Sequence, residues 1–195
     1  MSPTELVTEL TRRAKAASER AAELASDPKD AALRLAADRL EASSAAIVRE
    51  NARDLEAGRA RGLDAAMLDR LALDAERIAA IANGLREVAA LPDPVGEVTR
   101  MWNRPSGLQV GRMRIPLGVI LVIYESRPNV TADVAALCLK SGNATILRGG
   151  SEAIHSNRAL AAVLRAAFAE AGVPEDALQL VPTTELSRTQ HGITV

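Results

Sequence analysis

The chain has 195 residues, a formal net charge of −1, 25% charged residues and 48% hydrophobic residues, which is enough for one packed domain with a helical extension and argues against disorder. The even charge and the 2% aromatic content argue against nucleic-acid binding, which needs a basic surface or stacking platforms. The apolar run 118–124 is too short to span a membrane, and the polar start does not resemble a signal peptide. We therefore expect a cytoplasmic protein.

Residues 1–91 are predicted to form a helical segment. Ser2-Pro3-Thr4-Glu5 combines a capping box with proline at the first helical position, so a helix should run to about Leu24. Residues 63–73 suggest a short helical piece, and Asp74 is placed to cap another helix. With the long helix described next, this makes three or four helices.

The long helix is predicted to begin at Asp27-Pro28-Lys29-Asp30 and to run toward Asn51, with a possible continuation to Gly58. Its apolar residues recur at helical spacing, so one face should be buried. These residues are Leu33, Ala37, Leu40 and Ile47.

Residues 92–114 are predicted to form a linker followed by an antiparallel ribbon. Two prolines two positions apart end the helical segment. Residues 98–102 and 108–114 then flank a loop whose proline and glycine suit a five-residue hairpin connection. Because the alternation of apolar residues is weak, we expect the ribbon to be half covered, with Trp102 as a packing residue.

Residues 115–184 are predicted to form a partial βαβ domain with three parallel strands. The expected order is strand 118–124, helix 130–140 stopped by Gly142, strand 144–147, helix 153–171 and strand 178–181. The first strand is almost continuously aliphatic, which is typical of a strand buried on both faces. We predict an α/β fold in which helices and an antiparallel ribbon precede an incomplete Rossmann-like sheet.

The first candidate site is the segment Arg148, Gly149, Gly150, Ser151 and Glu152, which follows a strand and opens a helix. Free backbone N–H groups, the helix dipole and an arginine would converge there, which suits a phosphate or a ribose. The alternative is a tight turn whose glycines serve geometry alone. A GxGxxG dinucleotide fingerprint is absent.

The second candidate site is the loop that contains Ser126, Arg127 and Asn129. Asn129 is predicted to cap the following helix, and Arg127 beside that helix start favours an anionic substrate group. The alternative is a capped helix with a solvated arginine. Because both candidate sites follow strands of one parallel sheet, we expect them to form a cleft at the carboxyl ends of the strands.

The remaining reactive residues give no metal site. Cys138 is predicted to be a small buried residue, on a stripe with Val130, Val134, Leu137 and Ser141. His155 and His191 lack metal-ligand spacing, and His155 is expected to face solvent.

The motif PLGVILVIYESRPNVTADVAALCLKSGNATILRGGSEA, with GLDAAMLDRLAL and DPVGEV before it, closely resembles the gamma-glutamyl phosphate reductases of the aldehyde dehydrogenase superfamily. The resemblance covers about residues 1–184. It implies an NADPH-dependent enzyme of proline biosynthesis that converts L-glutamyl 5-phosphate to L-glutamate 5-semialdehyde and phosphate.

The resemblance also implies roles for individual residues. Arg148 and Glu152 lie where relatives hold the adenosine ribose; an arginine suits the 2′-phosphate of NADPH, whereas the glutamate opposes it. The asparagine that binds the oxyanion in the superfamily is replaced by Ser126, which leaves Asn129 or backbone N–H groups as further candidates. Relatives also use such ribbons in oligomers, so a homo-oligomer through residues 98–114 is expected.

The nucleophilic cysteine of the family belongs to a separate catalytic domain, to which no segment of this sequence corresponds. Residues 185–195 form an atypical tail, so we expect a truncated chain without a catalytic residue, inactive by itself. The alternative is a non-catalytic nucleotide-binding or interaction module, or an inactive remnant.

Overall fold

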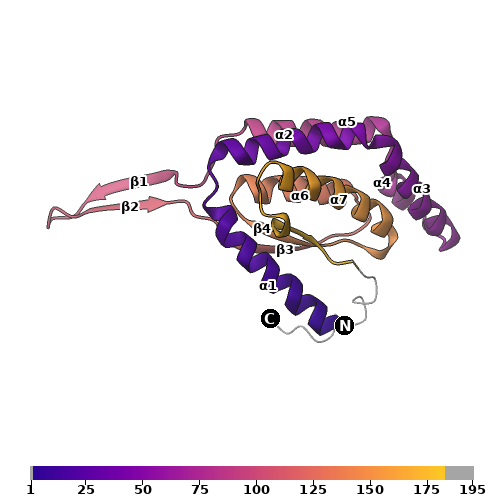
Figure 1. Cartoon of the computed structure of the whole chain (residues 1–195), viewed down its shortest axis with the longest axis horizontal. Coiled ribbons are helices and arrows are strands. Elements are labelled where there is room, and N and C mark those ends of the chain that lie inside the picture. Colours follow the sequence, from indigo (N-terminus) through magenta and orange to yellow (C-terminus); the bar gives the residue numbers. More distant parts are fainter. Residues whose placement is uncertain (1, 183–195) are drawn as a thin grey trace.

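The computed structural model describes residues 2–182, which form helices around a small parallel sheet, with a separate projecting ribbon (Figure 1). The elements are α1 (Pro3–Ala22), α2 (Ser26–Ala42), α3 (Ser44–Ala60), α4 (Ala65–Leu71), α5 (Ala75–Ala90), β1 (Val98–Asn103), β2 (Gln109–Met113), β3 (Val119–Ile123), α6 (Asn129–Lys140), β4 (Ala144–Arg148), α7 (Ile154–Glu170) and β5 (Leu178–Leu180), with short 3-10 turns at Ser151–Ala153 and Glu175–Ala177. None of the described helices is both long and apolar enough to cross a bilayer.

The molecule is layered. α6 and α7 pack on one face of the sheet, and α2 and α5 pack on top of these two helices, while α1 lies on the opposite face (Figure 1). The largest apolar cluster fills the space between these helices and the sheet. This arrangement confirms the predicted α/β fold.

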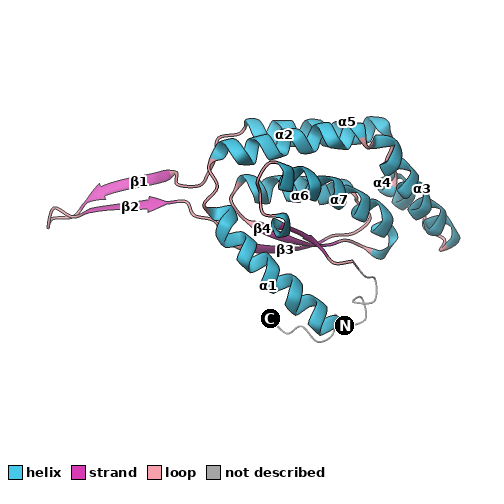
Figure 2. Ribbon diagram, viewed as in Figure 1, coloured by secondary structure: helices cyan, strands magenta, loops and turns pink. Residues whose placement is uncertain are grey.

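The sheet has the strand order β3-β4-β5, and both pairings are parallel, as predicted (Figure 2). The predicted burial of the first strand on both faces is wrong, because Leu121 and Ile123 are each 57% exposed. The reason is that α1 reaches mainly β4, where its Leu10 and Ala14 pack against Ile146. The outer positions of β3 are therefore left uncovered by the described residues.

The local helix signals are confirmed, but one helix boundary was missed. Ser2 Oγ accepts from the Glu5 N–H at 3.2 Å and the Glu5 carboxylate accepts from the Ser2 N–H at 2.7 Å, so the capping box forms. The predicted long helix is interrupted at Ser43, which ends α2 and begins α3. Serine competes for backbone hydrogen bonds and has low helix propensity, which favours the break.

The predicted buried face of these two helices is correct, and five helices, in place of three or four, occupy residues 3–90. Breaking the long helix lets α2 pack along α5 while α3 turns to contact α4 and the start of α7. Asp74 caps α5 as predicted, since its side chain accepts from the Arg77 N–H at 2.7 Å.

Two buried lysines tie α2 to its surroundings, Lys29 to the linker and Lys140 from α6, a feature that the sequence did not reveal. Lys29 Nζ lies 2.5 Å from Asp93 and Lys140 Nζ lies 2.5 Å from Asp30. Burial opposes the charge of Asp93, but its hydrogen bond from Lys29 contributes to a net lowering of the Asp93 pKa. Removing either partner of such a pair would leave a buried charge uncompensated, which strongly destabilises a folded protein.

The ribbon is confirmed as an antiparallel pair, with a bulge between Val98 and Arg100. It extends away from the body of the molecule, at the left of Figure 2. The expected half-coverage is wrong, because almost every residue of both strands is exposed. Trp102 is the one partly buried residue of β1, and the Arg100 guanidinium carbon lies 5.5 Å from its ring centroid.

Candidate functional site

The two candidate loops meet, as the sequence predicted, because β3 and β4 are adjacent parallel strands. The Ser126 N–H and Oγ–H both donate to Oε1 of Glu152, at 2.6 and 2.9 Å. Ser126 itself is buried and has φ +35°, which is unusual for a residue other than glycine. The contact joins the loop after β3 directly to the loop after β4.

Glu152 folds back over its own loop. A Cβ atom on Gly150 would lie 2.0 Å from Glu152 Oε1, so the position accepts only glycine while the carboxylate stays there. Burial opposes the charge of Glu152, yet the N–H groups of Glu152 and Ser126 and the Ser126 hydroxyl produce a net lowering of its pKa. The carboxylate is therefore charged and bound to protein donors, and a ribose would have to compete with Ser126 for it.

Gly149 also has an internal reason to be glycine. Its Cβ would lie 2.1 Å from Nδ2 of Asn157, a fully buried side chain. Asn157 Oδ1 accepts from the Thr131 hydroxyl at 3.1 Å, and the Tyr124 hydroxyl lies 2.6 Å from the same Thr131 oxygen. Burial raises the pKa of Tyr124 to about 12. Both glycines thus satisfy close packing, which agrees with the alternative of a tight turn.

The start of α7 is closed by an acidic side chain that the sequence did not indicate. The carboxylate of Asp54 in α3 is 2% exposed and accepts from the N–H groups of His155 and Ser156, at 3.1 and 2.7 Å. It also accepts from the Ser156 hydroxyl at 2.6 Å. The prediction of free N–H groups at this helix start is therefore wrong for these two residues. The available signal was a polar residue on the buried stripe of α3, which also contains Ile47 and Asn51.

Arg148 and Ser151 are the members of the first cluster whose side chains remain open, since Ser151 is also partly exposed and makes no side-chain hydrogen bond within the described residues. Arg148 ends β4, is partly exposed, and its side chain makes no hydrogen bond or ion pair within the described part of the chain. Its positive charge helps to lower the pKa of Glu152. A partly exposed guanidinium at the carboxyl end of a parallel strand fits an anionic group of a nucleotide.

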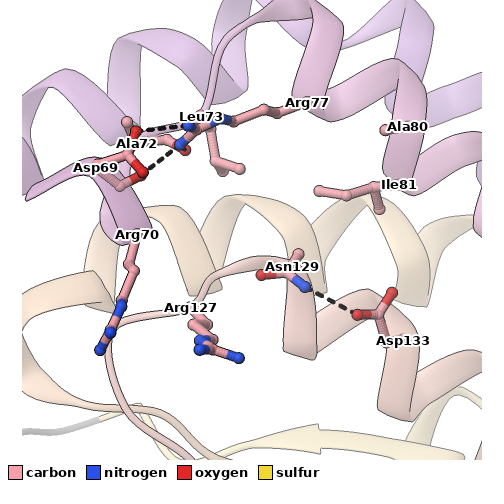
Figure 3. Close-up of a pocket in the computed structure, with 10 residues that line it drawn as sticks. All are labelled: Asp69, Arg70, Ala72, Leu73, Arg77, Ala80, Ile81, Arg127, Asn129 and Asp133. Atoms are coloured by element: carbon pink, nitrogen blue, oxygen red, sulfur yellow. Dashed lines mark hydrogen bonds and ion pairs between the residues drawn. The ribbon is translucent and has the colours of Figure 1, made fainter. Parts of the chain in front are cut away.

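The second cluster opens onto a pocket of ≈ 470 Å³ between the α4–α5 connection and the start of α6 (Figure 3). Arg127 and Asn129 line it, as does Arg70, a residue of the motif GLDAAMLDRLAL to which the sequence assigned no role. The other lining residues are Asp69, Ala72, Leu73, Arg77, Ala80, Ile81 and Asp133.

Asn129 does not cap α6, so that prediction is wrong. Pro128 occupies the N-cap position without a side-chain hydrogen bond, and Asn129 Nδ2 donates to Oδ2 of Asp133 at 2.9 Å. Proline before the helix fixes the turn by its own backbone preference, which leaves the asparagine side chain free for this contact. Figure 3 shows the pair on the pocket wall.

The remaining predictions concern Cys138 and the histidines. Cys138 is 6% exposed and burial raises the pKa of its thiol, as expected for an inert residue, but its predicted stripe partner Leu137 is 54% exposed. His155 faces solvent only in part, because its Nδ1 lies 3.7 Å from Glu50. His191 lies outside the described residues. Within residues 2–182, no three His, Cys, Asp or Glu side chains are grouped to hold a metal ion.

Residues 2–192 match the model of the aldehyde dehydrogenase family, and the chain belongs to this family. Enzymes of this family use nicotinamide nucleotide cofactors. More distant aldehyde dehydrogenases, such as one from Listeria monocytogenes with 15% identity and a TM-score of 0.68, share the fold.

Within the family the chain is similar to gamma-glutamyl phosphate reductases, which confirms the resemblance of its motifs. It is 59% identical over 185 residues to that protein of Geotalea daltonii, which covers 95% of this chain and 44% of the relative. The crystal structure of the Thermotoga maritima protein superposes with a TM-score of 0.89 at 38% identity, over 94% of this chain and 44% of that one. For the Saccharomyces cerevisiae protein the TM-score is 0.86 at 33% identity, over 94% and 47%. The chain thus spans less than half the length of these relatives.

Proposed function

We propose that this chain forms the nucleotide-binding part of an NADPH-dependent reductase, which converts L-glutamyl 5-phosphate to L-glutamate 5-semialdehyde and phosphate. The similarity to gamma-glutamyl phosphate reductases supports the substrate and the reaction. The observation that carries the proposal is that two polar loops, joined by Ser126 and Glu152, lie at the carboxyl ends of adjacent parallel strands. Ligands of open α/β sheets bind at such a place.

Arg148 and the loop Gly149–Glu152 would hold the adenosine end of the nucleotide, which supplies a hydride when bound. The structure bears on the conflict between an arginine that suits a 2′-phosphate and a nearby glutamate that opposes it. Three protein donors already hold the Glu152 carboxylate, which leaves it less available to the ribose hydroxyls, whereas the Arg148 side chain makes no hydrogen bond or ion pair within the described residues. This supports NADPH over NADH.

Calorimetric titration of the 195-residue chain with NADPH and NADH tests this assignment. We expect NADPH to bind about tenfold or more tightly, because a charge-assisted hydrogen bond contributes about 1.5–3 kcal/mol. Arg148→Met should remove most of that difference, whereas Arg59→Met, which changes an exposed arginine on α3, should leave it intact. Equal affinity for the two nucleotides, or an unaffected Arg148→Met variant, would contradict the assignment.

We further assign Ser126 to the acyl oxygen of the substrate. Its N–H and Oγ–H converge on a single carboxylate oxygen, which stands in for an oxygen that gains negative charge during reaction. Asn129 is the second candidate. Its amide donates to Asp133, and both Ser126 donors are held by Glu152, so an acyl oxygen would reach Ser126 only in exchange for the Glu152 carboxylate.

The reaction also needs a thiolate to attack the acyl phosphate, and Cys138 does not suit it, because burial raises its pKa. We therefore expect the 195-residue chain to bind NADPH without oxidising it in the presence of glutamyl phosphate. Measurable turnover by this chain would overturn that expectation. A cytoplasmic location stays a prediction.

The ribbon is proposed to join copies of the protein. Its exposed apolar side chains include Val98, Met101 and Met113, which are 53 to 59% exposed. Sedimentation should show association of the chain at tens of micromolar, and Met101→Glu should weaken it because a charge would enter the contact. A monomer throughout this range would contradict the proposal.

A further inference from the structure

We propose that the pocket beside α6 recognises the head of an α-amino acid: Arg70 and Arg127 bind its α-carboxylate and Asp133 binds its α-ammonium group. The substrate class rests on the proposed function, but Arg70 and Asp133 are assigned by neither the motifs nor the comparisons. Three features of the pocket support this assignment. Two arginines in it have no partner within the described residues, one aspartate has a carboxylate oxygen available, and the backbone of one wall is held by hydrogen bonds.

The cations are Arg70, in the last turn of α4, and Arg127, between β3 and α6. Both residues are exposed, and within residues 2–182 neither side chain makes a hydrogen bond or an ion pair. Figure 3 shows both guanidinium groups on the same side of the pocket. Two neighbouring guanidinium groups without an intervening carboxylate favour an anion, and their planar donor forks match a carboxylate.

The carboxylate is that of Asp133, one turn into α6 and on the far side of Arg127 from Arg70 (Figure 3). Its Oδ2 accepts from Asn129 Nδ2 at 2.9 Å, which orients the group and leaves its other oxygen available. Although Asp133 keeps exposed surface, the protein around it raises the pKa of its carboxyl by desolvation. A bound ammonium would offset this cost, whereas a simple anion such as phosphate would meet repulsion from Asp133.

The wall that carries Arg70 is fixed by its neighbours. Arg77 donates to Oδ1 of Asp69 at 2.6 Å and to the carbonyl of Ala72 at 2.9 Å. Its positive charge is therefore paired with Asp69 and is less available to a ligand. Beneath this wall, the side chain of the buried Asn51 donates to the Leu71 carbonyl and accepts from the Leu73 N–H, each at 2.8 Å. The backbone on both sides of Arg70 is therefore held in place, so that only the exposed Arg70 side chain has to become ordered when a ligand binds.

The position of the pocket suits the same substrate. Arg127 directly follows Ser126, the residue assigned to the acyl oxygen. The acyl end of an amino acid held at Arg127 by its head group would reach the Ser126 donors in exchange for the Glu152 carboxylate that they bind. Residues 62–73 and the loop after β3 are separate motifs in the sequence, and the fold brings these two segments to one pocket.

The test is a titration of the ¹⁵N-labelled 195-residue chain with L-glutamate, glutarate and inorganic phosphate, followed by NMR. We expect L-glutamate to shift the amides around Arg127 and Asp133, and Arg70→Met or Arg127→Met to weaken its binding about tenfold or more, as loss of a charge-assisted hydrogen bond implies. Arg59→Met is the matched control on an exposed helix surface and should have no effect. Glutarate, which lacks the ammonium, should bind more weakly than L-glutamate, and Asp133→Asn should abolish that difference.

Three outcomes would overturn the inference: L-glutamate binding that is insensitive to all three variants, equal binding of glutarate and L-glutamate, or phosphate binding through the arginines without L-glutamate binding. NADPH binding, measured on the same samples, separates the two proposals. If NADPH binds through Arg148 and L-glutamate does not bind, only the amino-acid site fails. If NADPH binding does not depend on Arg148, the nucleotide assignment fails, whatever the result with L-glutamate.

Discussion

The starts of α6 and α7 occupy equivalent places, each after a strand of the same parallel sheet, yet they differ in how their polar groups are used. At α7 the buried Asp54 accepts from His155 and Ser156, so the first turn is closed from within. At α6 Pro128 provides no side-chain cap, and Arg127 and Asn129 line an open pocket.

The comparison teaches that a glycine-rich turn between strand and helix is not by itself evidence of a ligand site. Gly149 accommodates Asn157, Gly150 accommodates Glu152, and the Glu152 carboxylate is held by Ser126. Arg148 and Ser151 are the side chains of that loop left to meet a ligand. The loop after β3 has no glycine, and its charges are the more accessible ones.

The largest expected effect tests the closure of α7. Asp54→Ala should lower the free energy of unfolding by about 3 kcal/mol, because buried N–H and O–H donors lose a charged acceptor. Asp64→Ala, which removes an exposed cap of α4, is the matched control and should cost about 1 kcal/mol. Urea unfolding measures both. A cost for Asp54→Ala no greater than that for Asp64→Ala would mean that the α7 start is not closed as described.

The second largest loss of stability is expected for the contact between Ser126 and Glu152, which joins the two loops. Ser126→Ala should cost about 1.5 kcal/mol, because it removes a hydroxyl donor to a charged carboxylate. Ser126→Gly removes the same bond but releases the positive φ of 35°. Glycine usually destabilises relative to alanine by about 0.5–1 kcal/mol, and here relief of the left-handed conformation should cancel that penalty. If glycine proved clearly worse than alanine in urea unfolding, Ser126 would not hold this conformation.

A smaller effect, with a defined pH dependence, is expected for Glu152→Gln. At pH 7 the substitution should cost about 1 kcal/mol, since it removes the charge that Ser126 stabilises. The folded state lowers the pKa of Glu152 below its ordinary value of 4.5, so its stabilising contribution is fully present above that value and is lost as the pH falls through the lower folded pKa. Unfolding curves of the two proteins should therefore converge in acid. A difference that stays constant down to strongly acidic pH would argue against the charged contact.

The smallest expected effect concerns α6. Asn129→Ala should change stability by less than about 0.5 kcal/mol, because the side chain makes an exposed contact and does not cap the helix. A loss near 1 kcal/mol, typical of an N-cap, would show that the helix start is capped after all.

Features encoded by neighbouring residues were predictable from the sequence. The capping box at Ser2 and Glu5, the cap at Asp74 and the hairpin of the ribbon all form as expected. The strand and helix order after residue 115 is also correct, because apolar runs and punctuating glycines such as Gly142, with φ 70°, are local signals.

The larger errors come from contacts between segments far apart in the chain. Asp54 and Ser156 are 102 residues apart, and no local pattern indicates that one caps the helix of the other. Likewise the edge position of β3, which exposes Leu121, depends on where α1 packs. The pocket beside α6 could not be predicted from the sequence for the same reason. Arg70 and Arg127 belong to different motifs, and only the fold brings them to one pocket.

The most direct test of the division between the two loops is an NMR titration of the labelled chain with NADPH. The structure predicts that the amides of Arg148–Glu152 shift, and that the Ser126 amide follows through its bond to Glu152. The amides of His155 and Ser156, held by Asp54, should not move. If His155 and Ser156 shifted most while Arg148–Glu152 stayed unchanged, the nucleotide would bind at the start of α7, which would contradict both the closure of that helix start and the role of Arg148.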